Sequence, residues 1–180
     1  HHQPPLDVRE LFSLSPKDLS KLGDRLRELE EIEEVVLLST CNRVEAYLAV
    51  QTEADRESIL RIFAEVTGQS RNLLENLYYF HANNNMLVHL FSVAAGLDSQ
   101  MIGETEILGQ VKESLQTARK AGWCGRILGA LFERSFQAAK WARTHTGIGQ
   151  GQVTIGNVVV DLVQRVFGKV AGRRILLIGS

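Results

Sequence analysis

The chain contains the stretch Val35-Val-Leu-Leu-Ser-Thr-Cys-Asn-Arg-Val-Glu-Ala-Tyr47, and both its fold and its chemistry can be approached from there. An apolar run enters a short polar segment, and a run of alternating apolar residues leaves it. This pattern predicts a β-hairpin with strands over Val35–Ser39 and Val44–Val50. Cys41 then stands at the tip of the hairpin. Period-two spacing places on one face of the second strand Val44, Ala46, Leu48 and Val50.

Helix signals lie on both sides of the hairpin. Ser15-Pro16 begins a helix with a capping hydroxyl and a proline in the first turn. Its apolar face is formed by Leu19, Leu22, Leu26 and Leu29. A second amphipathic helix over Ala54–Thr67 stops at Gly68. Its inward residues are Ile59, Ile62, Phe63 and Val66. Leu77–His81 is expected to form a further short strand.

The order helix, hairpin, helix, strand predicts an α/β (α+β) domain built on a ferredoxin-like βαββαβ unit. Its first strand would precede His1. After His81 the pattern turns helical. Further helices are expected over Met86–Ala95, Ile107–Ala121, Arg126–His145 and Ile155–Phe167, with a break at Gly147–Gly151. We therefore expect a first domain over residues 1–145, a helical connector over 146–172 and a new strand over 173–180.

Composition sets broad limits on partners and compartment. A hydrophobic fraction of 44% and a charged fraction of 23% are ordinary for a globular protein. The net charge of −1 gives the whole chain no pull toward nucleic acid or a membrane surface. No apolar run approaches the roughly 18 residues that a membrane span needs, and no signal-peptide pattern opens the chain. The cysteines Cys41 and Cys124 do not form a disulfide framework, which favours a reducing compartment such as the cytoplasm.

The hairpin tip is the first candidate site. A thiol on a polar turn beside a cation is typical of a reactive thiolate, whereas a lone cysteine is more often an incidental small residue. Arg43 could stabilise the thiolate of Cys41 or bind a substrate carboxylate. Thr40 and Asn42 offer donors for a developing oxyanion. Local features alone leave the reactive and the incidental interpretation both open.

Two further segments could carry chemistry. His89 lies on an otherwise apolar helix, where a structural histidine is the commoner case, and His81 is interpreted as structural. The loop from Gly96 to Gln110 is rich in polar groups, and functional residues often occupy such loops. Asp98 and Ser99 could be turn residues, and Glu104 and Glu106 could favour the next helix through its dipole. A metal site is not favoured, because no CxxC or HxxxH spacing is present.

Four motifs in order give these segments a family resemblance. They are His1-His2-Gln-Pro-Pro-Leu-Asp-Val-Arg9, Ser39–Tyr47, His89–Ser99 continuing into Ile102–Lys112, and Thr144-His-Thr-Gly-Ile-Gly149. Together they resemble the N-terminal catalytic domain of the glutamyl-tRNA reductase family. The resemblance covers nearly the whole chain. It implies an NADPH-dependent oxidoreductase that reduces glutamyl-tRNA to glutamate-1-semialdehyde with release of tRNA. This is the first step of the five-carbon route to 5-aminolevulinate, porphyrins and other tetrapyrroles.

The resemblance also implies residue roles and partners. Cys41 would be the nucleophile that forms a thioester, and His89 a second catalytic residue. The substrate would be bound by Thr40, Asn42, Arg43, Ser99, Glu104, Thr105, Glu106 and Gln110. Gly179 would be the first glycine of a Rossmann fingerprint for NADPH, whose remaining glycines would lie beyond Ser180. A homodimer through a further C-terminal domain, and product transfer to glutamate-1-semialdehyde aminomutase, would follow, in the bacterial cytoplasm or the plastid stroma.

One departure and one rival interpretation remain open. Glu106 stands where glutamine is common in the family, which makes that substrate contact the least secure. The rival is a tRNA-binding module without chemistry. It rests on basic residues that could form one phosphate-binding face, namely Arg119, Lys120, Arg126, Arg134, Lys140 and Arg143. Reactivity of the Cys41 thiol would distinguish the two interpretations.

Overall fold

A computed structural model describes residues 12–52, 55–99, 106–149 and 155–168 of the chain. The elements in these ranges are α2 (Pro16–Arg27), β1 (Ile32–Ser39), β2 (Val44–Val50), α3 (Arg56–Thr67), α4 (Arg71–Leu77), α5 (Asn83–Ala95), α6 (Glu106–Lys120), α7 (Arg126–His145), the 3₁₀ turn η1 (Gly147–Gly149) and α8 (Ile155–Phe167). The described part is thus a helix-rich α+β structure around one two-stranded antiparallel sheet.

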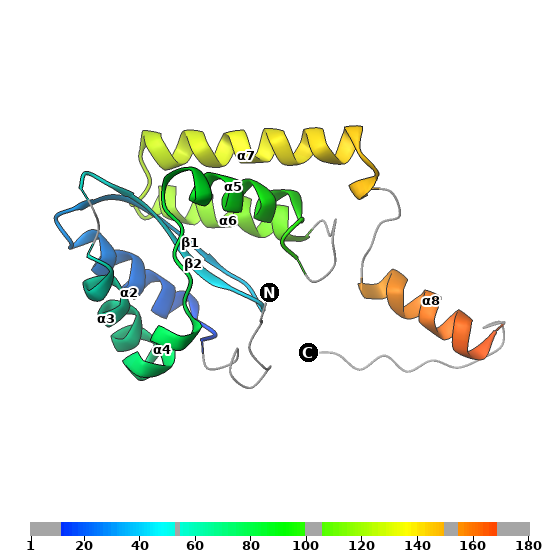
Figure 1. Cartoon of the computed structure of the whole chain (residues 1–180), viewed down its shortest axis with the longest axis horizontal. Coiled ribbons are helices and arrows are strands. Elements are labelled where there is room, and N and C mark those ends of the chain that lie inside the picture. The colour runs from blue at the N-terminus through cyan, green and yellow to red at the C-terminus, as the bar shows by residue number, and fades with distance from the viewer. Residues whose placement is uncertain (1–11, 53–54, 100–105, 150–154, 169–180) are drawn as a thin grey trace.

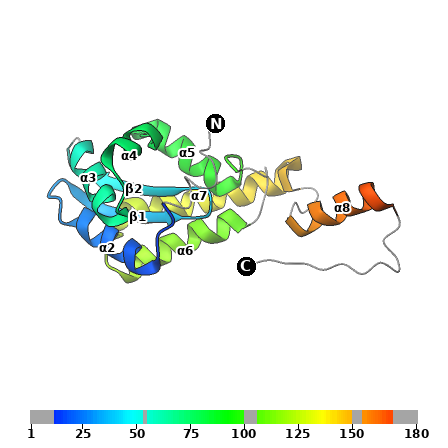
Figure 2. The same cartoon turned by 90° about the horizontal axis from the view of Figure 1, so that it is seen from below.

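Helices cover both faces of the hairpin (Figure 1). α2 packs on β1 from one side, and α3 packs on α2; α6 and α7 pack on β1 from the other side, and α5 packs on both of them. The turned view shows the same two helical layers around the paired strands (Figure 2). Because both faces are covered, β1 is buried over nearly its whole length, which explains its continuous apolar run. α8 contacts no other element among the described residues.

The hairpin and the alternation along β2 are confirmed. The face of β2 that is more deeply buried, however, is not the face made only of apolar residues. Buried positions are Glu45, Tyr47 and Ala49, whereas Val44, Ala46 and Leu48 are half-buried and Val50 is exposed. Tyr47 meets Phe132 of α7 edge-on, with 5.2 Å between ring centroids. By strand alternation, Val44, Ala46 and Leu48 face the opposite layer of α2 and α3. A carboxylate therefore lies on the core face of the sheet.

The helix predictions are confirmed with small shifts at the ends. The Ser15 hydroxyl accepts the amide of Asp18 at 3.2 Å, and Gly68 ends α3 in the left-handed region at φ 68°. The predicted strand over Leu77–His81 is wrong. The Ser70 hydroxyl caps a helix at the Leu73 amide, and this helix, α4, extends through Leu77. The segment after it has no regular structure, and its exposed aromatic residues are Tyr78, Tyr79 and Phe80.

The described residues therefore contain the helix, hairpin and helix of the expected βαββαβ order but lack the strand that would follow them. The aromatic segment instead uses its side chains: Arg56 lies over the ring of Phe80 at 3.8 Å, and the hydroxyl of Tyr79 reaches β2. The predicted strand over residues 173–180 and the segment before residue 12 lie outside the described residues.

A buried carboxylate fixes the start of α7. Glu34 of β1 is buried, and its two oxygens accept the amides of Ile127 and Leu128 at 2.9 and 2.8 Å. These are free amides of the first helical turn, where negative charge is also favoured by the helix dipole. Gly125 leaves the room, since a Cβ there would lie 2.5 Å from Glu34 Oε1. Glu34 thus links the sheet to α7 across 93 residues of sequence.

We expect Glu34→Ala to lower the free energy of unfolding of the chain by roughly 2–3 kcal/mol, because one buried and one partly buried amide would lose their charged acceptor. Urea denaturation followed by circular dichroism measures this. The exposed neighbour Glu33→Ala is the matched control and should change stability by less than about 0.5 kcal/mol. Equal effects of the two variants would contradict the capping role.

Candidate functional site

The hairpin tip is held by Thr40. Its amide donates to the carbonyl of Arg43 at 2.9 Å, and its hydroxyl oxygen accepts the amides of Asn42 and Arg43 at 3.1 and 3.2 Å. These bonds close the four-residue turn between the two strands. Cys41 is exposed at the tip. Among the described residues, its thiol makes no hydrogen bond or ion pair, so the turn presents the sulfur to solvent on a fixed backbone.

Glu45 is the centre of a polar cluster directly behind this tip. It is only 7% exposed. Its Oε2 accepts the hydroxyl of Tyr47 at 2.5 Å. Its Oε1 lies 3.1 Å from Arg43 Nη1 and 2.9 Å from His89 Nε2, and also accepts the hydroxyl of Tyr79. Both oxygens are satisfied, as a buried charge requires.

These partners keep Glu45 ionised. Burial by itself raises the pKa of a carboxyl group, but the hydrogen bond and charge of His89, the Arg43 guanidinium and the Tyr47 hydroxyl outweigh it and lower the pKa of Glu45 to about 2. Burial and the neighbouring Glu45 charge in turn raise the pKa of Tyr47 and that of Tyr79. Both phenols therefore act as hydrogen-bond donors to the carboxylate.

Arg43 is engaged by two carboxylates. Its Nη1 lies 3.1 Å from Glu45 Oε1 and 3.2 Å from Asp98 Oδ2, and its Nη2 donates to the main-chain carbonyl of Asp98. Burial opposes the charged form, yet Glu45 and Asp98 together raise the pKa of Arg43 above its ordinary value. Arg43 thus joins β2 to the residues that follow α5, and its guanidinium is already positioned to hold carboxylates.

The same cluster orients His89. An ionised Glu45 can only accept, so Nε2 of His89 carries a proton and donates to it. In the neutral ring, the basic lone pair is then on Nδ1, which lies 3.6 Å from Asp98 Oδ2. The ring also lies beside His81 and Tyr79, with 4.9 and 5.4 Å between ring centroids. His89 is therefore held by partners on three separate segments.

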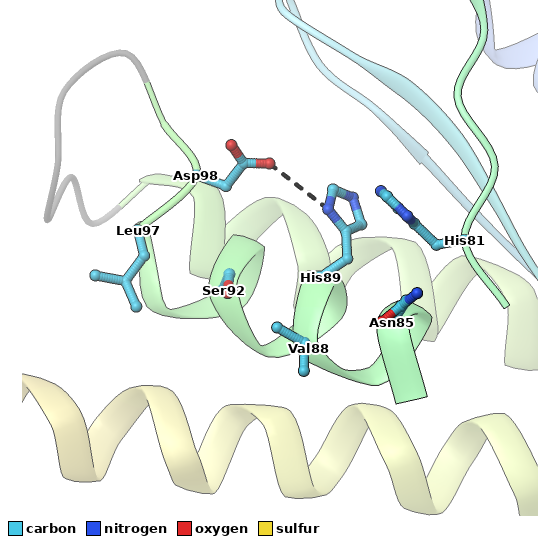
Figure 3. A pocket seen from close by; sticks show the side chains of 7 residues that line it. All are labelled: His81, Asn85, Val88, His89, Ser92, Leu97 and Asp98. Carbon is cyan, nitrogen blue, oxygen red and sulfur yellow. Dashed lines mark ion pairs between the residues drawn. The ribbon is translucent and has the colours of Figure 1, made fainter. Parts of the chain in front are cut away.

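His89 and Asp98 border an open pocket of about 440 Å³ (Figure 3). The pocket is lined by His81, Asn85, Val88, His89, Ser92, Leu97 and Asp98. In the close view, the Asp98 carboxylate points toward the His89 ring from the end of α5, and His81 approaches it from the aromatic segment (Figure 3). The lining combines apolar surface with an amide, a hydroxyl and titratable groups, a composition typical of small-molecule sites.

The structure unites some predicted site residues and not others. Thr40, Cys41, Asn42 and Arg43 share the hairpin tip, and Arg43 is linked to His89 through Glu45 and Asp98. Three more are described but take no part in this cluster: Ser99 follows Asp98, Glu106 is exposed at the start of α6, and Gln110 is half-buried on α6. Glu104, Thr105 and Gly179 lie outside the described residues.

Sequence reasoning missed four members of the cluster. Glu45, Tyr47 and Tyr79 received no role, and Asp98, in a loop considered as functional, was left open as a turn residue and not named as a site residue. The sequence signal for Glu45 was a charged residue in the middle of a strand that pairs with a continuously apolar strand. That signal indicates a buried carboxylate only once it is known that helices cover both faces of the hairpin. His81, interpreted as structural, lines the pocket. Among the described residues, no group of three or more His, Cys, Asp or Glu side chains could hold a metal ion.

Comparison with known proteins places this chain in a family. A family model described as glutamyl-tRNAGlu reductase, N-terminal domain, matches residues 1–146. The chain belongs to the glutamyl-tRNA reductase family. Two similar relatives are the glutamyl-tRNA reductases of Syntrophus aciditrophicus, 40% identical, and of Akkermansia muciniphila, 36% identical. Each match covers 100% of this chain but only 43% and 53% of those relatives, respectively.

A solved structure extends the match to the fold. The glutamyl-tRNA reductase from Methanopyrus kandleri superimposes with a TM-score of 0.69 at 31% sequence identity, over 92% of this chain and 38% of that one. The helix-rich arrangement around the hairpin is therefore that of the N-terminal part of a glutamyl-tRNA reductase. None of the helices in the described segments is long and apolar enough to span a bilayer.

We expect Glu45 to make stability depend on acid. Its pKa is about 2 in the folded state against an ordinary 4.5, so its contribution is complete above about pH 4.5 and is lost as the pH falls toward 2. The difference in unfolding free energy between the chain and Glu45→Gln should therefore shrink by an amount on the order of 3 kcal/mol across that window. Urea titrations at several pH values measure it.

The exposed Glu113→Gln on α6 is the control for this titration and should show no comparable pH dependence relative to the unmodified chain. A difference in unfolding free energy between the unmodified chain and Glu45→Gln that stays constant from pH 5 to pH 2 would contradict an ionised, buried Glu45.

Proposed function

We propose that this chain is the N-terminal part of a protein that reduces glutamyl-tRNA to glutamate-1-semialdehyde through a thioester on Cys41. The observation that carries the proposal is the cluster itself: an exposed thiol shares a fixed turn with an arginine set up for carboxylates, and Glu45 joins that arginine to a histidine whose Nε2 donates to it. Membership of the glutamyl-tRNA reductase family supports it. Release of tRNA in this step would begin tetrapyrrole synthesis.

Cys41 is the proposed nucleophile. Its thiolate attacks the carbonyl carbon of the aminoacyl ester, the new C–S bond forms, and the C–O bond to the terminal ribose breaks, so that tRNA leaves. A thioester accepts hydride more readily than an oxygen ester, because sulfur donates less resonance to the carbonyl. Exposure of Cys41 at the tip fits a substrate as large as tRNA, since no other described element covers the sulfur.

Arg43 is the proposed recognition residue for the glutamate side chain. A carboxylate of the substrate would meet a guanidinium that already binds Glu45 and Asp98. Asp98 is the more exposed of these two partners, so we propose that the substrate carboxylate takes over the place of Asp98 on Arg43 while Glu45 holds the guanidinium from behind. The uncharged amide of a glutamine side chain would not compensate for the lost ion pair between Asp98 and Arg43. Glutaminyl-tRNA would therefore be rejected.

His89 is the proposed proton donor to the leaving ribose oxygen. Since its Nε2 proton is held by Glu45, the proton given up would be the second proton of the imidazolium form, carried on Nδ1, and the neutral ring would remain after the transfer. No hydrogen bond joins His89 to Cys41 among the described residues, which favours this role over direct activation of the thiol. Asn42 and Thr40 remain the proposed donors around the carbonyl, and the substrate-binding roles proposed for Ser99, Glu104, Thr105, Glu106 and Gln110 are part of the same proposal.

The hydride would come from NADPH. Of the residues expected to hold it, the chain contains only Gly179, at the end of a segment we propose to be the first strand of a Rossmann domain. We propose residues 1–145 as the ferredoxin-like catalytic domain and 146–172, with α8, as the connector. Residues of this chain would then bind the substrate and carry the nucleophile, and residues of a further domain would bind NADPH. A homodimer and transfer of the aldehyde to the aminomutase complete the proposal.

The 180-residue chain should form a covalent glutamyl adduct without NADPH, since Cys41, Arg43 and His89 all lie within it. Incubation with radiolabelled glutamyl-tRNA, followed by acid precipitation and treatment with neutral hydroxylamine, should show label that hydroxylamine releases, as expected for a thioester. Cys41→Ser should abolish this adduct, and Cys124→Ser, at the half-buried second cysteine, should retain it. Label that persists as a thioester on Cys41→Ser would overturn the assignment.

We expect Arg43→Lys to reduce the rate of adduct formation with glutamyl-tRNA by about 10- to 100-fold and to narrow its preference over glutaminyl-tRNA, because a lysine cannot hold Asp98 or a substrate carboxylate in the planar two-donor geometry. Single-turnover labelling with both substrates measures the change. Arg71→Lys is the control, since Arg71 also binds two carboxylates but on the exposed surface of α4. Unchanged discrimination in Arg43→Lys would remove Arg43 from substrate recognition.

A further inference from the structure

The outer face of α7 is not explained by the site described above. One side of this helix packs on α5, α6 and the hairpin. The other side is a continuous exposed stripe at helical spacing that runs the length of the helix, formed by Arg126, Ile127, Ala130, Arg134, Gln137, Lys140, Trp141, Thr144 and His145. No described element covers this stripe.

Its charge is one-sided. Arg126, Arg134 and Lys140 are exposed and form no ion pair among the described residues. The acid in the helix, Glu133, is already bound to Arg119 of α6, with 2.6 Å between Oε1 and Nη2. The chain as a whole carries a net charge of −1, so this helix concentrates positive charge that the rest of the chain balances. A surface of this kind is complementary to a polyanion.

The stripe also presents an aromatic surface. Trp141 is 61% exposed, and its ring stacks on His145 with 4.8 Å between centroids and 16° between planes. The His145 ring is fixed because its Nδ1 lies 2.9 Å from the Trp141 carbonyl. Trp123, in contrast, is 6% exposed and donates its indole N–H to Asp24. Trp123 is a core residue, whereas the packing of the described fold does not explain why a tryptophan occupies position 141.

The position of the stripe links it to the site. Ala139 packs against Ala94 and Ala95 at the C-terminal end of α5, so Lys140 and Trp141, the next residues of α7, are level with that end along the helix. The next residues along the chain, Leu97 and Asp98, line the pocket, and Asp98 binds Arg43. In Figure 1 the C-terminal half of α7 extends past this end of α5. The aromatic and basic part of the stripe thus lies at the end of α7 that is level with Leu97 and Asp98, on the face turned away from α5.

We propose that the C-terminal half of α7 binds the RNA of the aminoacylated substrate next to its acceptor end, with Trp141 stacking on an unpaired base and with Arg134 and Lys140 contacting backbone phosphates. This inference rests on the proposed function and adds to it the surface that holds the nucleic acid. Unpaired bases stack on exposed aromatic rings, and phosphates bind exposed arginine and lysine, which is how single-stranded RNA ends are held. A protein partner is less suited to this face, because a single large aromatic residue stands there among charged and polar ones.

The test uses the full-length protein with uncharged tRNA(Glu), measured by filter binding over a range of salt concentrations. Trp141→Ala should raise the dissociation constant about 10-fold or more through lost stacking. Arg134→Ala with Lys140→Ala should raise it further and lower the slope of log K against log salt by about 2. The matched control is Lys17→Ala with Lys21→Ala, exposed lysines on α2 in the opposite layer, which should leave both quantities unchanged.

A second measurement asks whether Trp141 is free before RNA binds. Hydroxyl-radical footprinting read by mass spectrometry should oxidise Trp141 in the full-length protein, and tRNA should protect it while inorganic phosphate should not. A Trp141 that is unreactive without RNA is covered by another part of the protein, and that result would overturn the proposal. Unchanged tRNA affinity in the Trp141 and Arg134/Lys140 variants would overturn it as well.

Failure of this inference is distinguishable from failure of the proposed reaction. Variants that bind tRNA normally while the unmodified protein forms the Cys41 adduct would reject only the α7 surface. Weakened binding in the variants, in a protein whose Cys41 takes up no label, would support the surface and reject the thioester chemistry. Adduct formation from a minimal glutamyl ester of adenosine should be unaffected in Arg134→Ala with Lys140→Ala, since that substrate lacks the phosphates these residues contact.

Discussion

The structure depends on one buried negative charge. Glu45 lies on the core face of β2, where an isolated carboxylate would be costly, and it is tolerated because four partners from three segments donate to it. Those segments are the hairpin, the aromatic segment after α4, and α5. Satisfying this one group therefore requires that all three come together in one arrangement. Removing any single donor would leave part of the charge uncompensated, so the cluster behaves as a unit.

In this arrangement a rigid cluster around Glu45 lies behind an exposed turn that carries Cys41. Arg43 and His89 are fixed by Glu45 from below, whereas Cys41, on the same hairpin, has no partner among the described residues and is open to solvent. Preorganised charged groups beside an accessible nucleophile suit a reaction in which a very large substrate must deliver one small ester to the protein. Asp98 lines the pocket together with His89 and is the more exposed of the two carboxylates on Arg43, so it is the natural position at which a substrate carboxylate would compete.

The second buried carboxylate, Glu34, has a structural role of the same physical kind. It holds the first amides of α7 and so sets the position of that helix on the sheet. The inner face of α7 then closes the core through Phe132, and its outer face carries the basic and aromatic stripe. One glutamate thus organises the chemistry and the other the helix we propose to bind RNA, and together they are the buried charged side chains of the described structure.

Local sequence patterns determined much of this protein. The Ser15 cap, the Gly68 stop, the helical spacing of the leucines in α2 and the polar turn around Cys41 are encoded within a few residues, because capping, turn formation and periodicity are short-range effects. The strand predicted over Leu77–His81 failed since aromatic residues favour strands only when a partner strand is available, and here the Ser70 cap and the Tyr79–Glu45 contact decided otherwise. The sequence also singled out Arg43 and His89, but not their partners within the fold, Glu45 and Asp98. The contacts of Glu45 with His89 and of Arg43 with Asp98 span 44 and 55 residues, and the burial of Glu45 arises only when helices cover both faces of the hairpin. These are decisions of the tertiary structure, because the cost of burying a charge, and therefore the need for its partners, exists only after the chain has folded.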